Sequence, residues 1–412
     1  MSLREIGTFN GQSQNELMGS SVAINYNGTI IALGIRGKTF NGNTTKDGQV
    51  IVYRYQADNS WNIIGTFNGT ESSELGSSVE LDNSGNLLMI SAPRYNIGTQ
   101  TNVGRVIVCR YQADNSWNII GTFTGTISNE YFGKGIALNY NGNDIKVAIG
   151  SSPTAYGRVD VYRYIIDNSW DSIGRFDGLS TKNDNIGQYI TFSKNGINLA
   201  IGSPKNWSKG GNNSIAAGQV IIRKCNADNS FNTITIFDGV NGLALGDSLS
   251  FNYDGTIIAM GASLSNIPNT SAGNIIVQKY NASNNSWNKD SSMNNTNASA
   301  AHHRFGYQVK LDDTGKILFV TTKNFNPNNN TSDFTWGRVT RYNGNISSSW
   351  PVTNTLIGSS GLYFGESLGT NSDGTILITG STGYNSNAGQ VKVFKYVKRI
   401  QNVKLSGSIS HL

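Results

Sequence analysis

The thirteen residues ADNSWNIIGTFNG, which end at Gly69, recur almost unchanged as ADNSWNIIGTFTG, which ends at Gly125. Such close internal repetition predicts a chain built from copies of one structural unit. A glycine that follows an apolar or aromatic residue recurs at intervals of 54 to 60 residues, at Gly19, Gly76, Gly133, Gly187, Gly246, Gly306 and Gly365. A second glycine follows each of them nine residues later, so the chain contains seven copies of the unit.

Each copy reads as four consecutive β-strands. Apolar residues alternate after the first glycine, as at Val79 and Leu81, and a period of two is typical of a strand. The second glycine closes a hairpin turn such as NYNG or DNSG, because Asn, Asp and Gly accept left-handed backbone. A second strand follows, then a loop of variable length, a third strand such as GQVIVYRY, and a fourth such as WNIIGTF. No segment shows helical periodicity.

Seven four-stranded antiparallel units predict an all-β fold, a seven-bladed β-propeller, because a closed ring covers both faces of every sheet. We expect residues 1–412 to form one propeller domain, with first strands that start near residues 18, 75, 132, 186, 245, 305 and 364. The chain begins with a fourth-strand sequence that has no first three strands before it. Residues 3–9 are therefore predicted to complete the last blade. The C-terminal residues 401–408 also read as a fourth strand and are the alternative.

Composition excludes several classes of protein. The chain of 412 residues has 14% charged residues, a net charge of +6 and only two cysteines, so neither a disulfide framework nor a basic nucleic-acid surface is expected. No apolar run is long enough to span a bilayer, and the N-terminus does not read as a secretory signal peptide. We therefore predict no nucleic-acid partner, no membrane insertion, and an intracellular or virion-associated location. The oligomeric state is left open.

The repeats resemble the FG-GAP family, the propeller units of integrin α-chain heads. The "FG" of that pattern stands at Phe132-Gly133, Phe305-Gly306 and Phe364-Gly365, and the "GAP" box is matched loosely by SAP, GSP and GAS. The resemblance covers nearly the whole chain, and it implies binding and scaffolding roles. The composition also resembles that of proteins from AT-rich genomes, including large DNA viruses of protists.

Calcium is the first metal to consider, because FG-GAP blades can hold it in an Asp-rich loop between the first two strands. The corresponding turns here carry one or two carboxylates each, as at Asp312 and Asp313, whereas Ca²⁺ takes six or more oxygen ligands. We therefore predict hairpin turns without metal, and no metal or cofactor is expected.

Three other features are tempting as chemical sites. The sequence GESLG around Ser367 matches the G-x-S-x-G nucleophile motif, but a hairpin follows it instead of the helix that the motif requires. His302 and His303 lie in a polar insertion without a cysteine or carboxylate cluster, so solvated side chains are expected. Cys109 and Cys225 belong to blades two and four, which do not touch, so buried thiols are expected.

Aromatic residues recur at the start of the fourth strand. They could form a sugar-stacking ladder, but the favoured interpretation is packing against the neighbouring blade. The residues are Trp61, Trp117, Trp170, Phe231, Trp287 and Trp350.

The loops between the second and third strands are long in blades one, four and six, and all of them should lie on one face. Loops on a rigid scaffold commonly carry recognition residues, and aromatic side chains there could anchor a partner. The candidate partner-binding residues are Trp207, Phe325, Phe334 and Trp336. The alternative is unconstrained drift of loop length.

We therefore predict a protein without enzyme activity, a propeller scaffold that binds a protein or glycan partner, for example as a viral structural or host-interaction component. The alternative is a propeller hydrolase or lyase with its site at the central channel. Such enzymes need clustered charged side chains near the axis, whereas the inner-strand positions here are mostly Ser, Ala and Gly. The exceptions look scattered along the chain: Glu80, Asp247, Lys310 and Glu366.

Overall fold

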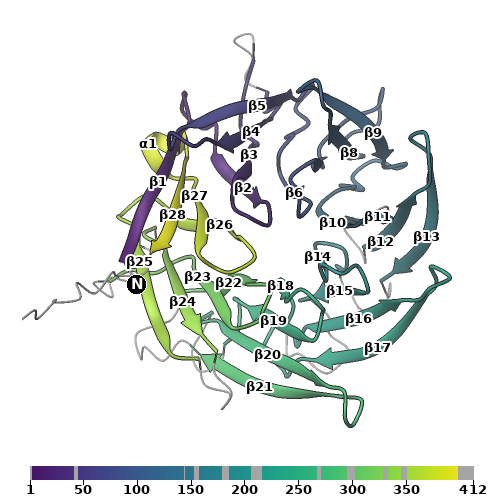
Figure 1. Ribbon diagram of the computed structural model, residues 1–412, viewed down its shortest axis with the longest axis vertical. Helices are drawn as coiled ribbons and strands as arrows, with labels where there is room; N and C mark the ends of the chain where they lie inside the picture. The colour runs from purple at the N-terminus through teal and green to yellow at the C-terminus, as the bar shows by residue number, and fades with distance from the viewer. Residues whose placement is uncertain are drawn as a thin grey trace, which may run out of the picture.

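The computed structural model describes residues 2–40, 45–142, 144–152, 157–178, 185–205, 216–266, 271–294, 302–327, 333, 335–344 and 350–397. Within these ranges, seven four-stranded antiparallel sheets form a ring around a central axis, which confirms the predicted seven-bladed propeller (Figure 1). One helical turn, α1 (Tyr384–Asn387), is the single helix among the described residues.

The strands follow the chain from the axis outward in each blade. Blade 1 contains β2 (Met18–Ile24), β3 (Ile30–Ile35), β4 (Gln49–Tyr55) and β5 (Trp61–Asn68). Blade 2 contains β6 (Val79–Leu81), β7 (Leu87–Ala92), β8 (Arg105–Tyr111) and β9 (Trp117–Thr124). Blade 3 contains β10 (Gly135–Asn141), β11 (Asp144–Ser151), β12 (Arg158–Tyr164) and β13 (Trp170–Asp177). Blade 4 contains β14 (Tyr189–Phe192), β15 (Asn198–Ser203), β16 (Gln219–Cys225) and β17 (Phe231–Asp238).

The remaining blades repeat this order, and the last one also uses the start of the chain. Blade 5 contains β18 (Ser248–Phe251), β19 (Ile257–Ala262), β20 (Asn274–Asn281) and β21 (Ser286–Asn294). Blade 6 contains β22 (Phe305–Leu311), β23 (Ile317–Thr322), β24 (Arg338–Asn343) and β25 (Val352–Ile357). Blade 7 contains β26 (Phe364–Thr370), β27 (Ile376–Ser381), β28 (Gln390–Val397) and β1 (Ser2–Asn10).

The first strands of four blades begin a few residues later than the repeats indicate, at Val79, Gly135, Tyr189 and Ser248. The first glycine of every blade has a positive φ angle, so the backbone is not extended at that residue. The apolar residues that precede the glycines contact the preceding blade instead, as in the isolated bridge between Leu75 and Gly48.

β1 closes the ring. It pairs antiparallel with β28, from Ser2 opposite Val397 to Asn10 opposite Gln390. β1, in blade 7, thereby continues along the chain into β2 of blade 1. Residues 401–408, the alternative closing strand, lie outside the described residues.

The hydrophobic core is divided into seven clusters, and each lies between two consecutive blades. In the first cluster, Val52 of blade 1 packs with Leu88 of blade 2, and both side chains are fully buried. A single blade would expose these faces to water, so the ring is stabilised by blade-to-blade burial.

The repeated tryptophans fasten neighbouring blades at the outer rim. Trp117 Nε1 donates a 2.8 Å hydrogen bond to the carbonyl oxygen of Ile64 on the outer strand of blade 1. Its indole meets Phe67 edge-on at 6.0 Å between ring centroids. A Cβ atom on Gly65 would lie 2.7 Å from Trp117 Nε1, so the glycine of NIIGTF makes room for the indole. Trp117 therefore packs against the neighbouring blade, as the favoured interpretation of the repeated aromatic residues predicted.

Hydrogen bonds between backbones tie together the hairpin turns that follow the first strands. The amide of Tyr26 donates to the carbonyl of Asn83 in the next blade at 2.9 Å, and Ser372 donates to Tyr26 across the closure at 3.0 Å. We call the channel end at these turns the lower mouth, and the opposite end, where the first strands begin, the upper mouth. None of the helices in the described residues has the length and apolar character needed to cross a membrane.

Candidate active site

The residue directly after the first glycine of each blade lines the upper mouth, around a cavity of about 290 Å³. Seven sequence-distant residues thereby form one ring: Ser20, Ser77, Lys134, Gln188, Asp247, Tyr307 and Glu366. The position before it is always glycine and the position after it is most often serine, whereas this position varies between Ser, Lys, Gln, Asp, Tyr and Glu. Variation at one register position inside an otherwise regular repeat is the sequence signal that could have located the site.

Glu366 is the centre of a polar cluster on blades 6 and 7. Lys323, just after β23, lies with Nζ 2.9 Å from Glu366 Oε2. Tyr307 Oη donates a 3.1 Å hydrogen bond to Glu366 Oε1, and Lys323 Nζ lies 3.0 Å from the same hydroxyl. Burial and the neighbouring Glu366 carboxylate raise the pKa of Tyr307, so its phenol stays protonated at neutral pH. The cluster thus combines a carboxylate, an ammonium group and a phenol.

A pocket of about 710 Å³ opens beside this cluster, between blades 7 and 1. Arg36 and Glu366 line both this pocket and the upper mouth, so the two spaces adjoin. Lys323 and Lys46 contribute further positive charge, while Tyr363 and Asn387 contribute aromatic and amide groups. An anionic or polyhydroxylated molecule would find matching partners in such a pocket.

Asp247 lies at the start of blade 5, two blades away from Glu366, and is already well bonded. The backbone amide of Ser263 lies 2.9 Å from Asp247 Oδ2, and the Ser263 hydroxyl also donates to this carboxylate. Burial raises the pKa of Asp247 to about 6, although the Ser263 hydrogen bonds act in the opposite direction. These contacts are structural, and they leave Glu366 as the better-placed base.

Ser367, the serine of GESLG, is also held in a structural contact. Its side chain is 7% exposed, and its hydroxyl donates a 2.7 Å hydrogen bond to the carbonyl of Gly19 in blade 1. Ser21 and Ser248, at the same repeat position, make the same bond to Gly76 and Gly306. Ser367 therefore joins blade 7 to blade 1. The next element in the chain is the strand β27, whereas the nucleophile motif requires a helix.

The structure places the predicted partner-binding residues in different surroundings. Phe325 is 7% exposed and packs between the His303 ring, 5.7 Å away, and the Arg338 guanidinium, 4.3 Å away. Trp336 is half-buried, and its Nε1 donates to Asp333 Oδ2 at 2.8 Å. Partner binding by these residues stays a prediction, and two of the candidates lie outside the described residues: Trp207 and Phe334.

His303 is buried, with 1% of its side chain exposed, whereas a solvated side chain was predicted. The imidazole ring of His303 packs against Phe325. Burial, with the positive charge of Arg338, lowers the pKa of His303 to about 4. His302, its neighbour, is exposed.

The burial of His303 against Phe325 predicts that the stability of the protein depends on pH. The unfolded chain takes up a proton at His303 near its ordinary pKa of 6.5, and the folded protein does so only near 4. We therefore expect the free energy of unfolding to fall as the pH drops through this interval. Urea unfolding between pH 7 and pH 4 should show a smaller fall for His303→Gln than for the native protein. The control His302→Gln should follow the native profile, and an unchanged profile for His303→Gln would contradict the prediction.

Comparisons with known proteins bear on what this arrangement does. No family model matches the chain, and no curated protein matches its sequence. The fold is similar to a protein from Bacteroides uniformis provisionally assigned as a 6-phosphogluconolactonase (TM-score 0.54, 11% identity, 83% of this chain and 86% of that chain). It is also similar to the periplasmic gluconolactonase of Pseudomonas aeruginosa (0.50, 12%, 83% and 86%). A third similar structure is Sqt1 of Saccharomyces cerevisiae (0.54, 13%, 97% and 100%).

These findings correct two predictions. The protein was expected to be a scaffold without enzyme activity, and this expectation is not upheld, because two structures that share its fold are named as lactonases. The alternative prediction was a propeller hydrolase or lyase with its site at the central channel. The prediction failed because the inner charges were judged by their separation in sequence. Ring closure brings Glu366 together with Arg36, Tyr307 and Lys323, which the sequence interpretation did not consider.

Proposed function

We propose that the protein is a hydrolase that opens carboxylic esters of the lactone type at the upper mouth, with Glu366 as general base. The observation that carries this proposal is the position of Glu366, between Lys323 Nζ at 2.9 Å and Tyr307 Oη at 3.1 Å, beside an open pocket of about 710 Å³. Ester hydrolysis needs a base to activate water and a positive charge to stabilise the oxyanion. Blades 1, 6 and 7 supply both.

The reaction follows from these groups. The Glu366 carboxylate removes a proton from a water molecule while the water oxygen bonds to the carbonyl carbon. The electron pair moves to the carbonyl oxygen, where Lys323 and Arg36 stabilise the negative charge. When the carbonyl re-forms, the ring carbon–oxygen bond breaks and the leaving oxygen takes the proton from Glu366. One lactone and one water thus give one hydroxy acid.

Tyr307 is a positioning residue in this scheme. Its phenol donates to the Glu366 carboxylate, and the ammonium of Lys323 lies 4.2 Å from the centroid of its ring. These contacts hold the base and the cation together. The names of the similar lactonases agree with this chemistry, although at 11% and 12% identity the likeness itself shows only a common fold.

The proposal is tested by pH-stat titration of the acid released from six-membered sugar lactones, with and without a phosphate group. The protein should raise the rate above spontaneous hydrolysis for at least one of them. Glu366→Gln should lower the catalysed rate by about 100-fold, because it removes the general base and retains the shape of the side chain.

Ser367→Ala is the matched control, since Ser367 is adjacent in sequence and is the residue of the nucleophile-like motif. Its rate should stay within about threefold of the native rate, while a lost hydrogen bond lowers stability by about 1 kcal/mol. Circular dichroism should show that both variants are folded. No catalysis by the native protein, full activity of folded Glu366→Gln, or loss of activity in Ser367→Ala would each overturn the assignment.

Kinship with the FG-GAP repeats, and an intracellular or virion-associated location, stay predictions from the sequence. The chain shares the propeller architecture that the resemblance implied. Localisation of the tagged protein in its own host would test the second point.

A further inference from the structure

The lower part of the channel is lined by the fourth residue after the first glycine of each blade. Five of these residues are small and uncharged: Ala23, Ala137, Thr191, Ser250 and Gly369. The other two are Glu80 of blade 2 and Lys310 of blade 6, which also line the upper space and therefore stand at the waist between the two. The lower cavity measures about 130 Å³, several times the roughly 30 Å³ that one water molecule occupies in the liquid.

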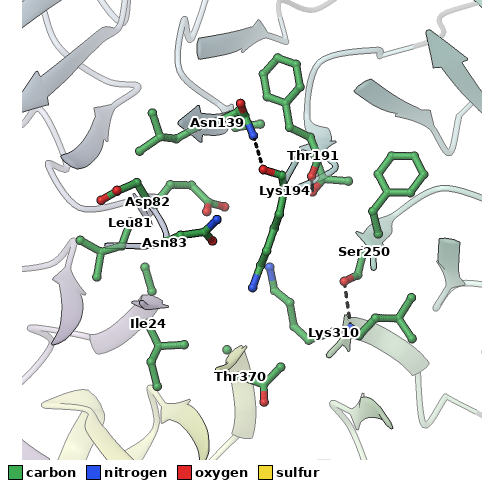
Figure 2. A pocket seen from close by; sticks show the side chains of 18 of the residues that line it. Ile24, Leu81, Asp82, Asn83, Asn139, Thr191, Lys194, Ser250, Lys310 and Thr370 are labelled. Atoms are coloured by element: carbon green, nitrogen blue, oxygen red, sulfur yellow. Dashed lines mark hydrogen bonds between the residues drawn. The ribbon is translucent and has the colours of Figure 1, made fainter. Parts of the chain in front are cut away.

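Two lysines reach into this cavity from different blades. Figure 2 shows the side chains of Lys194, in the turn after β14, and Lys310, on β22, extending into the same space. Lys194 Nζ lies 2.5 Å from Asp313 Oδ1. No hydrogen bond or ion pair joins the ammonium of Lys310 to another of the residues that the structure describes. A half-buried ammonium without a bonded partner is costly unless an anion approaches it.

Further donors face the same space. The side-chain amide of Asn83, in the turn of blade 2, makes no hydrogen bond within the described part of the chain, and Figure 2 shows it beside the cavity. Ser250 Oγ accepts a 2.9 Å hydrogen bond from the amide of Leu311, which leaves its own proton available. Glu80 is the opposing acceptor at the waist. Burial raises its pKa, while the positive charges of Lys310 and Lys194 act in the opposite direction.

We propose that the lower channel is a second ligand site, which binds a small oxyanion between Lys310 and Lys194, separate from the site at the upper mouth. Donors from blades 2, 4, 5 and 6 converge on it. Two carboxyl groups also line the cavity: Glu80 at the waist, and Asp82, which accepts a 2.7 Å hydrogen bond from the amide of Leu87. Oxyanions accept several hydrogen bonds at once, and a narrow channel strengthens their attraction to ammonium groups. Phosphate and short carboxylates share this chemistry.

Calorimetric titration of the full-length protein with inorganic phosphate, and separately with acetate, tests the proposal and distinguishes the two sources. Lys310→Met should weaken binding of the preferred anion at least tenfold. Glu80→Gln should tighten it severalfold, because it removes a carboxyl group that competes with the anion for Lys310 and Lys194. Effects in opposite directions at two neighbouring positions would not result from a general loss of structure. Thermal unfolding of both variants should stay near that of the native protein, because neither side chain forms a hydrogen bond or ion pair with another described residue.

The matched control is Lys323→Met, at the upper mouth, which should leave this binding unchanged. Loss of binding in Lys323→Met with normal binding in Lys310→Met would move the anion to the upper mouth and overturn the proposal. Absence of binding by the native protein to either anion would also overturn it. Because Glu366→Gln is used only for the activity, failure of the hydrolase proposal and failure of the anion site give separate results.

Discussion

A protein that lacks residues 1–10 is expected to lose cooperative folding, although the deletion removes only one of the 28 strands in the described part of the chain. β1 pairs with β28 along eight residue pairs and is the outer strand of blade 7. It also holds blade 1, because Trp61 Nε1 donates to the carbonyl of Ile6 at 2.8 Å and Phe9 packs on Tyr53 with centroids 4.5 Å apart.

The size of the effect follows from what β1 buries. Ile6 and Phe9 both pack into the cluster between blades 7 and 1. Both side chains are partly buried, so their burial contributes about 1 kcal/mol each, and each backbone hydrogen bond between the strands adds roughly 0.5–1.5 kcal/mol. The total approaches the roughly 5–15 kcal/mol by which ordinary domains are stable. Circular dichroism during urea unfolding should therefore show a broad transition with a midpoint at low urea concentration, or no transition.

A peptide of residues 1–12 added to the truncated chain should restore the transition, and the same peptide with Ile6 and Phe9 replaced by Ser should not. If residues 401–408 can serve as the closing strand, the truncated chain will unfold as cooperatively as the native one. That outcome would contradict closure by the N-terminal strand.

Gly150→Ala is expected to destabilise the protein by about 4 kcal/mol, a large effect for one added methyl group. A Cβ atom at this position would lie 1.7 Å from the carbonyl oxygen of Gly187 in the next blade, so two backbones would have to separate. Overpacking in a rigid core costs about 1–3 kcal/mol, and more where the obstacle is backbone that cannot rotate away. Urea unfolding measures the difference directly.

Gly98→Ala is the matched control. Gly98 has a φ of 55°, and a Cβ atom added there would have no neighbour within 4 Å, so alanine should cost only about 1 kcal/mol of backbone strain. The loss of stability is thus expected to be larger at Gly150 than at Gly98. A ranking by φ alone would give the opposite order, because Gly98 has a positive φ and Gly150 does not. Equal effects at the two positions would show that blade contact does not limit residue 150.

The sequence by itself predicted the number of blades, the four strands in each and the structural role of the repeated tryptophans. These are properties of a local pattern: alternation identifies strands, Asn-Gly and Asp-Gly identify turns, and equal spacing identifies copies. Less could be predicted about where the first strands begin, because the bridge between Leu75 and Gly48 depends on the neighbouring blade.

The candidate site could not be predicted in the same way. Arg36, Tyr307, Lys323 and Glu366 span 330 positions of the chain, and nothing local relates them. Only closure of the ring places them around one mouth, where burial and the Glu366 carboxylate raise the pKa of Tyr307. The repeat pattern thus determined the ring, because strand pairing and blade packing depend on short, recurring signals. The tertiary structure decided which of the varied residues meet, because residues at equal register are brought to one axis whatever their distance in sequence.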